Sequence, residues 1–325
     1  MRPLGRRTGF HTLDRWLYNA AVALRPPRET DLVLGVDLDG FLWARRRTLP
    51  FVASLKGIIA DELKNERGRV RALLAVQARW ERRNVTRADL VMVTSRYSAE
   101  VAQREYGVPP ERIAVVPEPI DIEVWDDQFW RAPRRQRAAP VVLCVARMYP
   151  RKRIEDLMRA AGILRARIPG IQVRVVGRGP EWPVLSRLHA ELGLGDAVAL
   201  LGDLTRERLA EEYANAGVFC LPSVQEGFGI VFLEAMAAEL PVVACRIAAV
   251  PEVVLDGVTG LLAPPRDPGA LAGLVERLIA DPALARRLGQ EGRRRALGFT
   301  PRHVAERFLH AVHSMDRLGQ RARGG

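Results

Sequence analysis

The most informative part of the sequence is GVFCLPSVQEGFGIVFLEAMA, residues 217–237. It opens with a short apolar run at 218–222, which is typical of a buried strand. Glu226 and two glycines follow, and an apolar segment from residue 230 onward favours a helix. A strand joined to a helix by a tight glycine turn is the repeating unit of parallel α/β sheets.

The same stretch predicts a site for an anion. Backbone N–H groups at a helix N-terminus point outward and favour negative charge, so the turn predicts a phosphate cradle. Gly227 and Gly229 let a ligand approach the backbone closely. Glu226 and Glu234 lie eight residues apart, about two helical turns, so their carboxylates could meet different parts of one elongated ligand.

Strand and helix patterns alternate along the whole chain, which indicates an α/β fold with parallel sheets. Amphipathic patterns predict helices at 12–24 and 154–167 and a last helix at 301–317. The segment 122–139 keeps no sustained period and is rich in Pro, Ala and charge, so we expect a linker between two domains there. The other apolar runs that predict buried strands are 32–36, 51–55, 90–94, 113–116, 141–146, 173–177 and 241–245.

Two further motifs follow predicted strands of the second domain. Arg147 and Lys152 come just after the strand at 141–146, where the carboxyl ends of parallel strands form a ligand crevice, and both side chains suit a diphosphate. Gly177 begins a GxG turn that fails as a dinucleotide fingerprint because Trp182 takes the place of the third glycine. Each motif alone also fits an ordinary turn or a solvated side chain. Their common position after strands of one domain favours a shared phosphorylated ligand.

Charge is the unusual feature of the composition. The 325 residues include 50 Lys+Arg against 38 Asp+Glu, a net charge of +12, and all but three of the basic residues are arginine. Such a balance suggests a polyanionic partner. The arginines recur on predicted helix faces, however, and no nucleic-acid-binding motif is present, so we expect a mostly solvated surface and no nucleic-acid partner, with an anionic membrane surface as the open alternative.

The cysteines and the hydropathy bear on the compartment. Cys144, Cys220 and Cys245 lie in apolar runs without CxxC spacing, so we expect buried free thiols and a cytoplasmic protein without a zinc site. No apolar run is long enough to span a membrane, and the basic N-terminus does not form a signal peptide. The helix at 12–24, with Trp16, Leu17 and Leu24, favours core packing, with a membrane or partner surface as the alternative.

From about residue 140 to 310 the sequence closely resembles the family 4 retaining glycosyltransferases of the GT-B fold. The resemblance rests on VARMYPRKR, VVGRGP, ANAGVFCLPSVQEGFGIVFLEAMA and PEVVLDGVTGLL. Ahead of these, LVLGVDLDG, FVASLKG, ADLVMVTSRYSAEVA and YGVPPERIAVVPEPID resemble the second half of the family's acceptor-side domain.

The resemblance implies two Rossmann-like domains with parallel sheets, the N-terminal one shortened. It implies an acceptor-side domain at 1–130, a donor-binding domain at 139–298, and a helix at 299–318 that packs back toward the N-terminal domain. It also implies transfer of a sugar from a nucleotide-diphosphate sugar, with retention and without a metal or other cofactor, in polysaccharide or glycoconjugate biosynthesis. The acceptor, a glycan, a lipid or a small molecule, and the oligomeric state stay open.

The resemblance also implies roles for single residues. Arg147 and Lys152 would hold the diphosphate and stabilise the leaving group, Glu226 would contact the transferred sugar, and Glu234 would bind the ribose hydroxyls. The remaining predicted substrate-binding residues are Gly227, Phe228, Gly229, Ile230, Val231, Lys56 and Gly177.

The sequence departs from the family pattern at several positions. Lys56 stands where many members carry a histidine, and as an ammonium it donates hydrogen bonds but accepts none. Glu239 stands where a helix-ending glycine is usual, which predicts backbone strain if the left-handed conformation is kept. Ala248-Ala249 replaces a glycine pair in the loop before Pro251, a change that concerns local backbone geometry. Glu118-Pro119 replaces the common Asn-Gly. The short N-terminal domain leaves a second hypothesis open, a relative that binds nucleotide sugar without independent catalysis.

Overall fold

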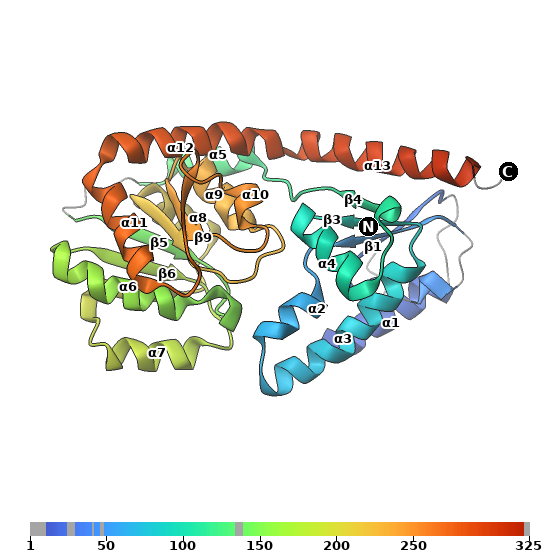
Figure 1. Ribbon diagram of the computed structural model, residues 1–325, viewed down its shortest axis with the longest axis horizontal. Helices are drawn as coiled ribbons and strands as arrows, with labels where there is room; N and C mark the ends of the chain where they lie inside the picture. Colours follow the sequence, from blue (N-terminus) through green and yellow to red (C-terminus); the bar gives the residue numbers. More distant parts are fainter. Residues whose placement is uncertain (1–10, 25–29, 41, 46–48, 134–138, 322–325) are drawn as a thin grey trace. The chain divides into compact units, whose positions relative to one another are not determined.

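The computed structural model describes residues 11–24, 30–40, 42–45, 49–133 and 139–321. The chain divides into two compact units, which are treated separately below. The first unit comprises Met1–Pro117 and Ala305–Gly325, and the second unit comprises Glu118–Val304. Each unit is built on a parallel sheet, so the predicted α/β class with two parallel-sheet domains is confirmed (Figure 1).

The first unit holds a four-stranded sheet in the order β1-β2-β3-β4. Its strands are β1 (Val33–Val36), β2 (Phe51–Leu55), β3 (Leu90–Val93) and β4 (Ile113–Val115), and its helices include α1 (His11–Leu24), α2 (Ile59–Glu62), α3 (Gly68–Arg87) and α4 (Arg96–Tyr106). Side chains alternate between the two faces of the sheet, as the two-residue period of a strand requires. Phe51, Ala53 and Leu55 pack in one core with residues of α3 and α4.

The opposite face of this sheet packs against the last helix, α13 (Pro301–Arg321). Val52, Leu90 and Met92 contact an apolar stripe of that helix, Phe308, Ala311, Val312 and Met315. Figure 1 shows α13 along one face of the first unit's sheet and α1 and α3 along the other. The C-terminal helix predicted from the amphipathic pattern is therefore observed, with its second part in the core of the first unit.

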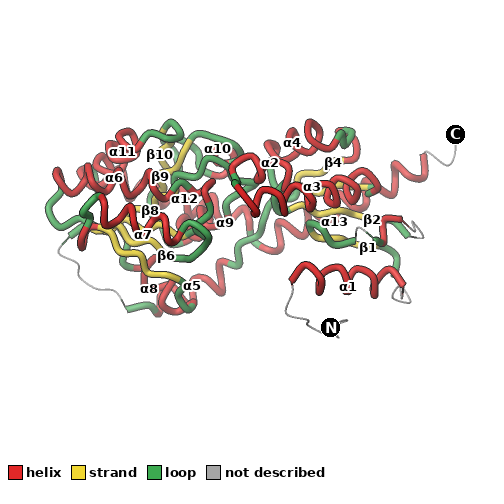
Figure 2. Tube along the Cα trace, turned by 90° about the horizontal axis from the view of Figure 1, so that it is seen from below, coloured by secondary structure: helices red, strands yellow, loops and turns green. Residues whose placement is uncertain are grey.

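The second unit holds a six-stranded parallel sheet in the order β10-β9-β8-β5-β6-β7. The strand order reverses between β5 and β8, which pair directly. Helices cover both faces: α6 packs beside α11, while α9 packs on α12 and α5 on α8 (Figure 2). The strands are β5 (Val141–Val145), β6 (Gln172–Val176), β7 (Val198–Gly202), β8 (Val218–Leu221), β9 (Val242–Cys245) and β10 (Gly260–Ala263); the helices are α5 (Ile122–Arg131), α6 (Ile154–Arg167), α7 (Trp182–Glu191), α8 (Arg206–Ala214), α9 (Ile230–Ala237), α10 (Val250–Val253), α11 (Pro268–Ala280) and α12 (Pro282–Ala296).

The predicted linker at 122–139 is wrong for most of its length. Residues 122–131 form helix α5 inside the second unit, and the boundary between the units falls after Pro117 rather than near 130. Ile122 and Phe129 are buried, and Trp125 packs edge-on to Tyr213 of α8 at 5.0 Å. The charged residues between these positions hide the helical period in the sequence. Residues 134–138 of the predicted linker lie outside the described residues.

The three cysteines are free and buried, as predicted. Burial raises the pKa of the Cys144 thiol to about 12, so it stays protonated at neutral pH. Within the described residues, none of the helices combines the length and the hydropathy that crossing a bilayer requires.

Candidate active site

The candidate site lies in the second unit, where the strand order reverses. In open α/β sheets, the loops that follow two strands on either side of such a reversal form the ligand crevice. The loop after β5 carries Arg147 and Lys152, and the loop after β8 carries Glu226. The two loops are joined directly, because the Val224 N–H donates to the Arg151 carbonyl at 2.8 Å.

Lys152 and Glu226 form an ion pair across these two loops. The Nζ atom of Lys152 lies 2.5 Å from Oε1 of Glu226, and the two side chains are only 14% and 8% exposed. The Ser223 hydroxyl donates to the same Oε1 at 2.7 Å. A buried carboxylate is costly unless a cation and hydrogen bonds compensate its charge, and here both are present. The structure thus brings together two residues 74 positions apart that the sequence predicted for one site.

The loop that carries Lys152 is held from its other end by α6. The short 3-10 turn Pro150–Lys152 ends at Arg153, which adopts the left-handed conformation with φ 50°. Its guanidinium donates two hydrogen bonds to the buried Asp156 carboxylate, at 2.7 and 2.8 Å. This fork offsets a strained backbone that costs about 1–3 kcal/mol in a non-glycine residue. The left-handed backbone at Arg153 fixes the direction of the chain directly after Lys152.

Arg147 lies at the start of the same loop and is exposed. Its guanidinium carbon lies 5.8 Å from the centre of the Tyr149 ring, which also stacks under Arg151 at 4.7 Å. The loop therefore carries one exposed and one partly buried cation, and their predicted contact with a diphosphate stays a prediction.

Gly177 packs against the backbone at the start of this loop. A Cβ atom at Gly177 would lie 2.2 Å from the Ala146 carbonyl oxygen, and one at Gly179 would lie 2.6 Å from that of Met148. Both positions therefore need glycine for the close packing of two backbones. The structure gives Gly177 this packing reason, and its predicted contact with a ligand stays a prediction.

Helix α9 begins at the glycine turn. Gly229 precedes its first residue with φ 90°, and a Cβ there would lie 2.6 Å from the Phe232 ring. Ile230 and Val231 form its first turn, and Phe228 packs edge-on to Phe299 at 5.6 Å. The positive end of the helix dipole therefore lies beside Glu226 and Gly227, at the crevice edge of the sheet.

Glu234 lies one turn further along α9, and it has a partner that the sequence did not predict. The hydroxyl of Tyr213, which is fully buried, donates to Oε2 of Glu234 at 2.9 Å. Burial raises the pKa of the Glu234 carboxyl, and the Tyr213 hydrogen bond lowers it in part. The Tyr213 ring is fixed by parallel stacking on Phe219 at 6.0 Å. Tyr213 and Ser223 are therefore the site residues that sequence reasoning missed; Ser223 lies three residues before Glu226, whereas Tyr213 gave no signal.

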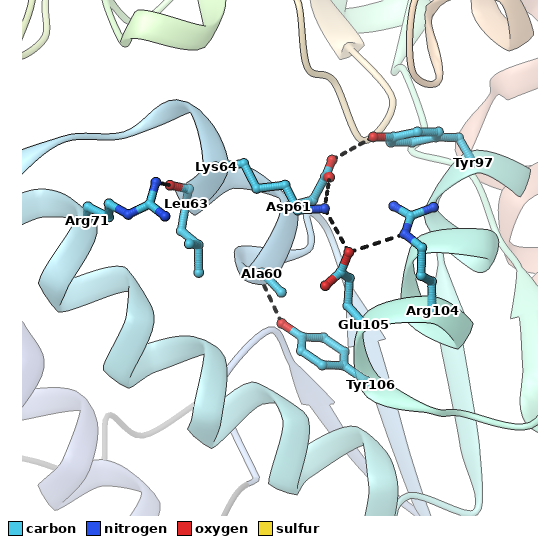
Figure 3. Close-up of polar contacts among 9 residues, drawn as sticks. All are labelled: Ala60, Asp61, Leu63, Lys64, Arg71, Tyr97, Arg104, Glu105 and Tyr106. Carbon is cyan, nitrogen blue, oxygen red and sulfur yellow. Dashed lines mark hydrogen bonds and ion pairs between the residues drawn. The ribbon is translucent and has the colours of Figure 1, made fainter.

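Lys56, the one predicted site residue of the first unit, follows β2 and is exposed. Its N–H donates to Asp37 Oδ1 at 2.9 Å. The segment after Lys56 is anchored by a polar network around α2 (Figure 3). In that network the Tyr97 hydroxyl donates to Asp61 at 2.7 Å, and the Lys64 ammonium bridges Asp61 and Glu105 at 3.2 and 2.7 Å.

A buried acid supports the same segment from below. Glu81 of α3 accepts a short hydrogen bond from the Tyr106 hydroxyl and a second, at 2.9 Å, from the Ile59 N–H. The Tyr106 hydroxyl in turn accepts from the Ala60 N–H at 3.1 Å. Burial raises the pKa of the Glu81 carboxyl to about 8, so it holds its proton at neutral pH.

The two aspartates of the stretch LVLGVDLDG, Asp37 and Asp39, make hydrogen bonds within the first unit. Asp39 accepts from Arg15 at 2.9 Å and from Asn19 at 3.0 Å. Among the described residues, no three His, Cys, Asp or Glu side chains gather in an arrangement that could hold a metal ion.

Two family models cover nearly the whole chain. The model described as Glycosyl transferases group 1 matches residues 126–295, and the one described as Glycosyltransferase Family 4 matches residues 6–124. The chain belongs to glycosyltransferase family 4. Its two parallel-sheet domains have the GT-B fold of that family.

Curated relatives of this family 4 chain include two actinobacterial enzymes. One is a GDP-mannose-dependent alpha-(1-6)-phosphatidylinositol monomannoside mannosyltransferase of Mycolicibacterium smegmatis, 36% identical over 65% of this chain and 58% of the relative. Another is a D-inositol 3-phosphate glycosyltransferase of Streptomyces bingchenggensis, 33% identical over 70% of this chain and 51% of the relative. The chain thus spans about half of the length of these relatives.

Solved structures show the same fold. Sucrose-phosphate synthase from Thermosynechococcus elongatus superimposes with a TM-score of 0.76 and 26% identity, over 96% of this chain and 81% of that chain. Anabaena HepE in complex with UDP and glucose superimposes with a TM-score of 0.75 and 24% identity, over 91% of this chain and 81% of that chain.

Proposed function

We propose that this protein is a retaining glycosyltransferase that moves a sugar from a nucleotide-diphosphate sugar to an acceptor hydroxyl without a metal ion. The observation that carries the proposal is the buried Lys152–Glu226 pair, 2.5 Å apart, at the strand reversal of the second unit. The pair stands beside the N-terminus of α9, which carries Glu234 on its second turn, so cationic, dipolar and carboxylate groups lie near one end of the sheet.

Each group has a part in this proposal. Arg147 and Lys152 bind the diphosphate, together with the N–H groups of residues 228–231, and stabilise the charge on the leaving nucleoside diphosphate. Gly227 and Gly229 allow the donor to approach the backbone. Glu226 binds hydroxyls of the transferred sugar, and Glu234, held by Tyr213, accepts from the ribose hydroxyls. Lys56 donates hydrogen bonds to the sugar or phosphate.

The proposed step is a displacement on one face of the sugar. The bond between the anomeric carbon and the diphosphate oxygen breaks, and the acceptor oxygen forms a bond to that carbon on the same face. The acceptor proton passes to the leaving diphosphate oxygen, so no net charge is created and no oxidant is needed. The cations and the helix terminus supply the positive charge that a metal would otherwise supply.

The names of the relatives guide the choice of acceptor. The two curated relatives are named for acceptors that contain inositol, one of them a lipid. Inositol-containing compounds are therefore the first acceptors to test, ahead of other glycans and small molecules. For the location we propose the cytoplasm, at the inner face of the membrane.

The test is a thermal-shift screen with UDP-, GDP- and ADP-sugars, followed by a transfer assay with the donor that stabilises. A ligand that binds only the folded state at 100 times its Kd stabilises it by about 2.7 kcal/mol. The matching nucleoside monophosphate is the control, and it should shift the melting temperature less because it leaves Arg147 and Lys152 without a diphosphate. Transfer should persist in EDTA and give the donor's anomeric configuration.

Three results separate the hypotheses. No stabilisation by any nucleotide sugar would exclude the donor site. Stabilisation without transfer to any inositol or glycan acceptor would favour the relative that binds nucleotide sugar without independent catalysis. Inverted product or loss of activity in EDTA would overturn the mechanism while keeping the family.

A further inference from the structure

Helix α3 concentrates positive charge on the first unit. Residues 67–87 contain seven arginines, and the sole acidic residue among them, Glu81, is buried and holds its proton. A solvated helix ordinarily mixes charges of both signs, which lets neighbouring turns attract one another. The arginines of this segment are Arg67, Arg69, Arg71, Arg79, Arg82, Arg83 and Arg87.

The same face of α3 also exposes apolar side chains. Leu73 is 49% and Val76 41% exposed. At 100° per residue, Val76 and Arg83 fall between Arg69 and Arg79, and Leu73 lies about 40° beyond Arg69. Leucine and valine amid exposed arginines is the pattern of a helix that lies at a membrane surface, where apolar groups enter the interface and cations meet lipid headgroups.

Helix α1 of the same unit exposes aromatic and apolar side chains. Trp16 and Tyr18 are each 45% exposed, and Leu13, Leu17 and Leu24 are exposed as well. The expectation that this apolar face packs in the core is therefore wrong, because the buried side of α1 is the one with Asn19 and Ala23. Tryptophan and tyrosine favour the boundary between headgroups and acyl chains.

The two helices belong to one side of the first unit. Asn19 of α1 and Asn84 of α3 both donate to Asp39, to its side chain and its carbonyl respectively, each at 3.0 Å. Both helices also contact the 3-10 turn Trp43–Arg45. Figure 1 shows α1 and α3 both on the side of the first unit's sheet opposite α13, and Figure 2 shows that the two helices lie apart on that side.

We propose that the α1/α3 face of the first unit binds the surface of an anionic lipid bilayer. Arginines supply the long-range attraction to acidic headgroups, and Trp16, Tyr18 and the exposed leucines and valine supply the short-range apolar insertion. Two copies of the chain meeting through this face across a two-fold axis would bring like charges together, which disfavours self-association. This inference deepens the membrane location proposed above by naming the surface that binds. The face lies outside the donor site, so vesicle binding is measured separately from sugar transfer.

The first experiment is co-sedimentation with vesicles, without any donor present. The protein should bind vesicles of phosphatidylglycerol and phosphatidylcholine at low salt, release as salt rises, and ignore vesicles of phosphatidylcholine alone. A variant with four arginines of α3 changed to Gln should bind the vesicles more than tenfold more weakly, since each charge contributes about fivefold. The four are Arg69, Arg79, Arg82 and Arg83. The matched control changes four exposed arginines of the second unit, Arg159, Arg187, Arg206 and Arg286, to Gln and should bind like wild type.

The second experiment tests the apolar part. The double variant Trp16→Ser and Leu17→Ser should reduce vesicle binding and remove the fraction of binding that remains at high salt. The control is Trp130→Ser with Val184→Ser, which changes exposed residues of the second unit and should bind vesicles like wild type. Four results would overturn the proposal. Two concern vesicles: wild type does not bind them, or the two arginine variants lose binding equally. The others are equally tight binding to a single-stranded oligonucleotide and a dimer that the α3 variant abolishes. Hydrolysis of a soluble donor, measured on the same variants, reports separately on the proposed transfer.

Discussion

Two buried glutamates, one in each unit, have opposite surroundings. Glu226 of the second unit accepts from an ammonium and a hydroxyl, whereas Glu81 of the first unit accepts from a phenol and a backbone amide. The first arrangement keeps a negative charge inside the protein by matching it with Lys152. The second removes the charge, because burial raises the pKa of Glu81 to about 8.

The difference separates a group suited to chemistry from one suited to support. A compensated ion pair can exchange partners, so under the proposed function Lys152 would turn to a phosphate and Glu226 to a hydroxyl of the donor. A neutral buried acid bonded to Tyr106 and Ile59 holds α3, α4 and the start of α2 together. We therefore expect Glu226 variants to affect activity and Glu81 variants to affect stability and its pH dependence.

Breaking the Lys152–Glu226 pair should produce the largest effect. Lys152→Met or Glu226→Gln alone should lower the transfer rate at least a hundredfold, the usual size when a preorganised electrostatic group is lost. Lys152→Met should also destabilise the protein by about 3–5 kcal/mol, because it leaves Glu226 buried without its cation. Initial rates and thermal unfolding measure the two effects.

The double variant decides whether the pair is chemical or structural. Removing both charges together should restore most of the stability without restoring transfer. Arg151→Met takes a cation from the same loop without touching the pair and should keep most of the activity. A double variant that transfers sugar at the wild-type rate would contradict the assignment.

Glu81 should make the first unit less stable as pH rises. An unfolded glutamate loses its proton near pH 4.5, whereas folded Glu81 keeps it up to about pH 8. The folded state therefore binds the extra proton between these values, and stability falls through that window by up to about 1.4 kcal/mol per pH unit. Hydrogen exchange of the β3 amides at pH 5, 6.5 and 8 measures this, after correction for the intrinsic exchange rate.

Glu81→Gln should remove this slope and keep the hydrogen bond from Tyr106. Glu105→Gln is the control: the Lys64 hydrogen bond lowers the pKa of Glu105, so its contribution is lost only as pH falls below the ordinary range. If wild type and Glu81→Gln respond alike between pH 5 and 8, Glu81 is ionised in the folded protein and the contrast with Glu226 fails.

Tyr213 gives Glu234 a phenol partner like the one that Tyr106 gives Glu81, but within the proposed site. Tyr213→Phe should weaken nucleoside diphosphate binding about tenfold, the value of one hydrogen bond to a charged group. It should also raise the pKa of Glu234 further, because the bond that lowers it is gone. Binding should therefore weaken at a higher pH than in wild type as the solution is acidified.

Calorimetric titration with ribose and deoxyribose nucleotides measures this effect. Wild type should discriminate between the two sugars more strongly than Tyr213→Phe does. Tyr97→Phe makes the same chemical change in the first unit, where it breaks the bond to Asp61, and should leave nucleotide affinity unchanged. Equal losses in both tyrosine variants would show a general effect on folding.

The strand-turn-helix pattern around residues 217–237 predicted the fold because local periodicity and glycine placement determine it. The pattern did not reveal β7 or β10, whose apolar runs are short and border glycine turns. It also missed α5, where Trp125 and Phe129 are buried only because α8 and other parts of the second unit cover them. Local sequence patterns cannot show which side chains are buried by elements distant in the sequence.

The candidate site, too, could be predicted from the sequence only in part. The spacing of Glu226, Gly229 and Glu234 predicted their common helix terminus, and the position of Lys152 after a strand predicted its approach to the same edge. The sequence could not reveal Tyr213, because only the folding of α8 against α9 brings its hydroxyl to Glu234. It could not reveal that Glu81 is neutral either, because in sequence it is one acid among arginines.

The smallest predicted effect concerns the backbone of the second unit. Glu239 and Ala248 adopt the left-handed conformation, with φ 57° and 51°. The sequence predicted strain at Glu239, whereas for Ala248-Ala249 it showed only that a glycine pair is replaced. Ala248→Gly and Glu239→Gly should each stabilise the unit by about 0.5–1 kcal/mol, because relief of the left-handed penalty exceeds the entropy that glycine loses on folding. Ala249→Gly is the matched control with φ −78°, and it should destabilise by a similar amount. Denaturant titration shows whether each variant gains or loses free energy of unfolding. If Ala248→Gly and Ala249→Gly destabilise the protein equally, the left-handed backbone at Ala248 carries no strain and the loop before α10 is relaxed.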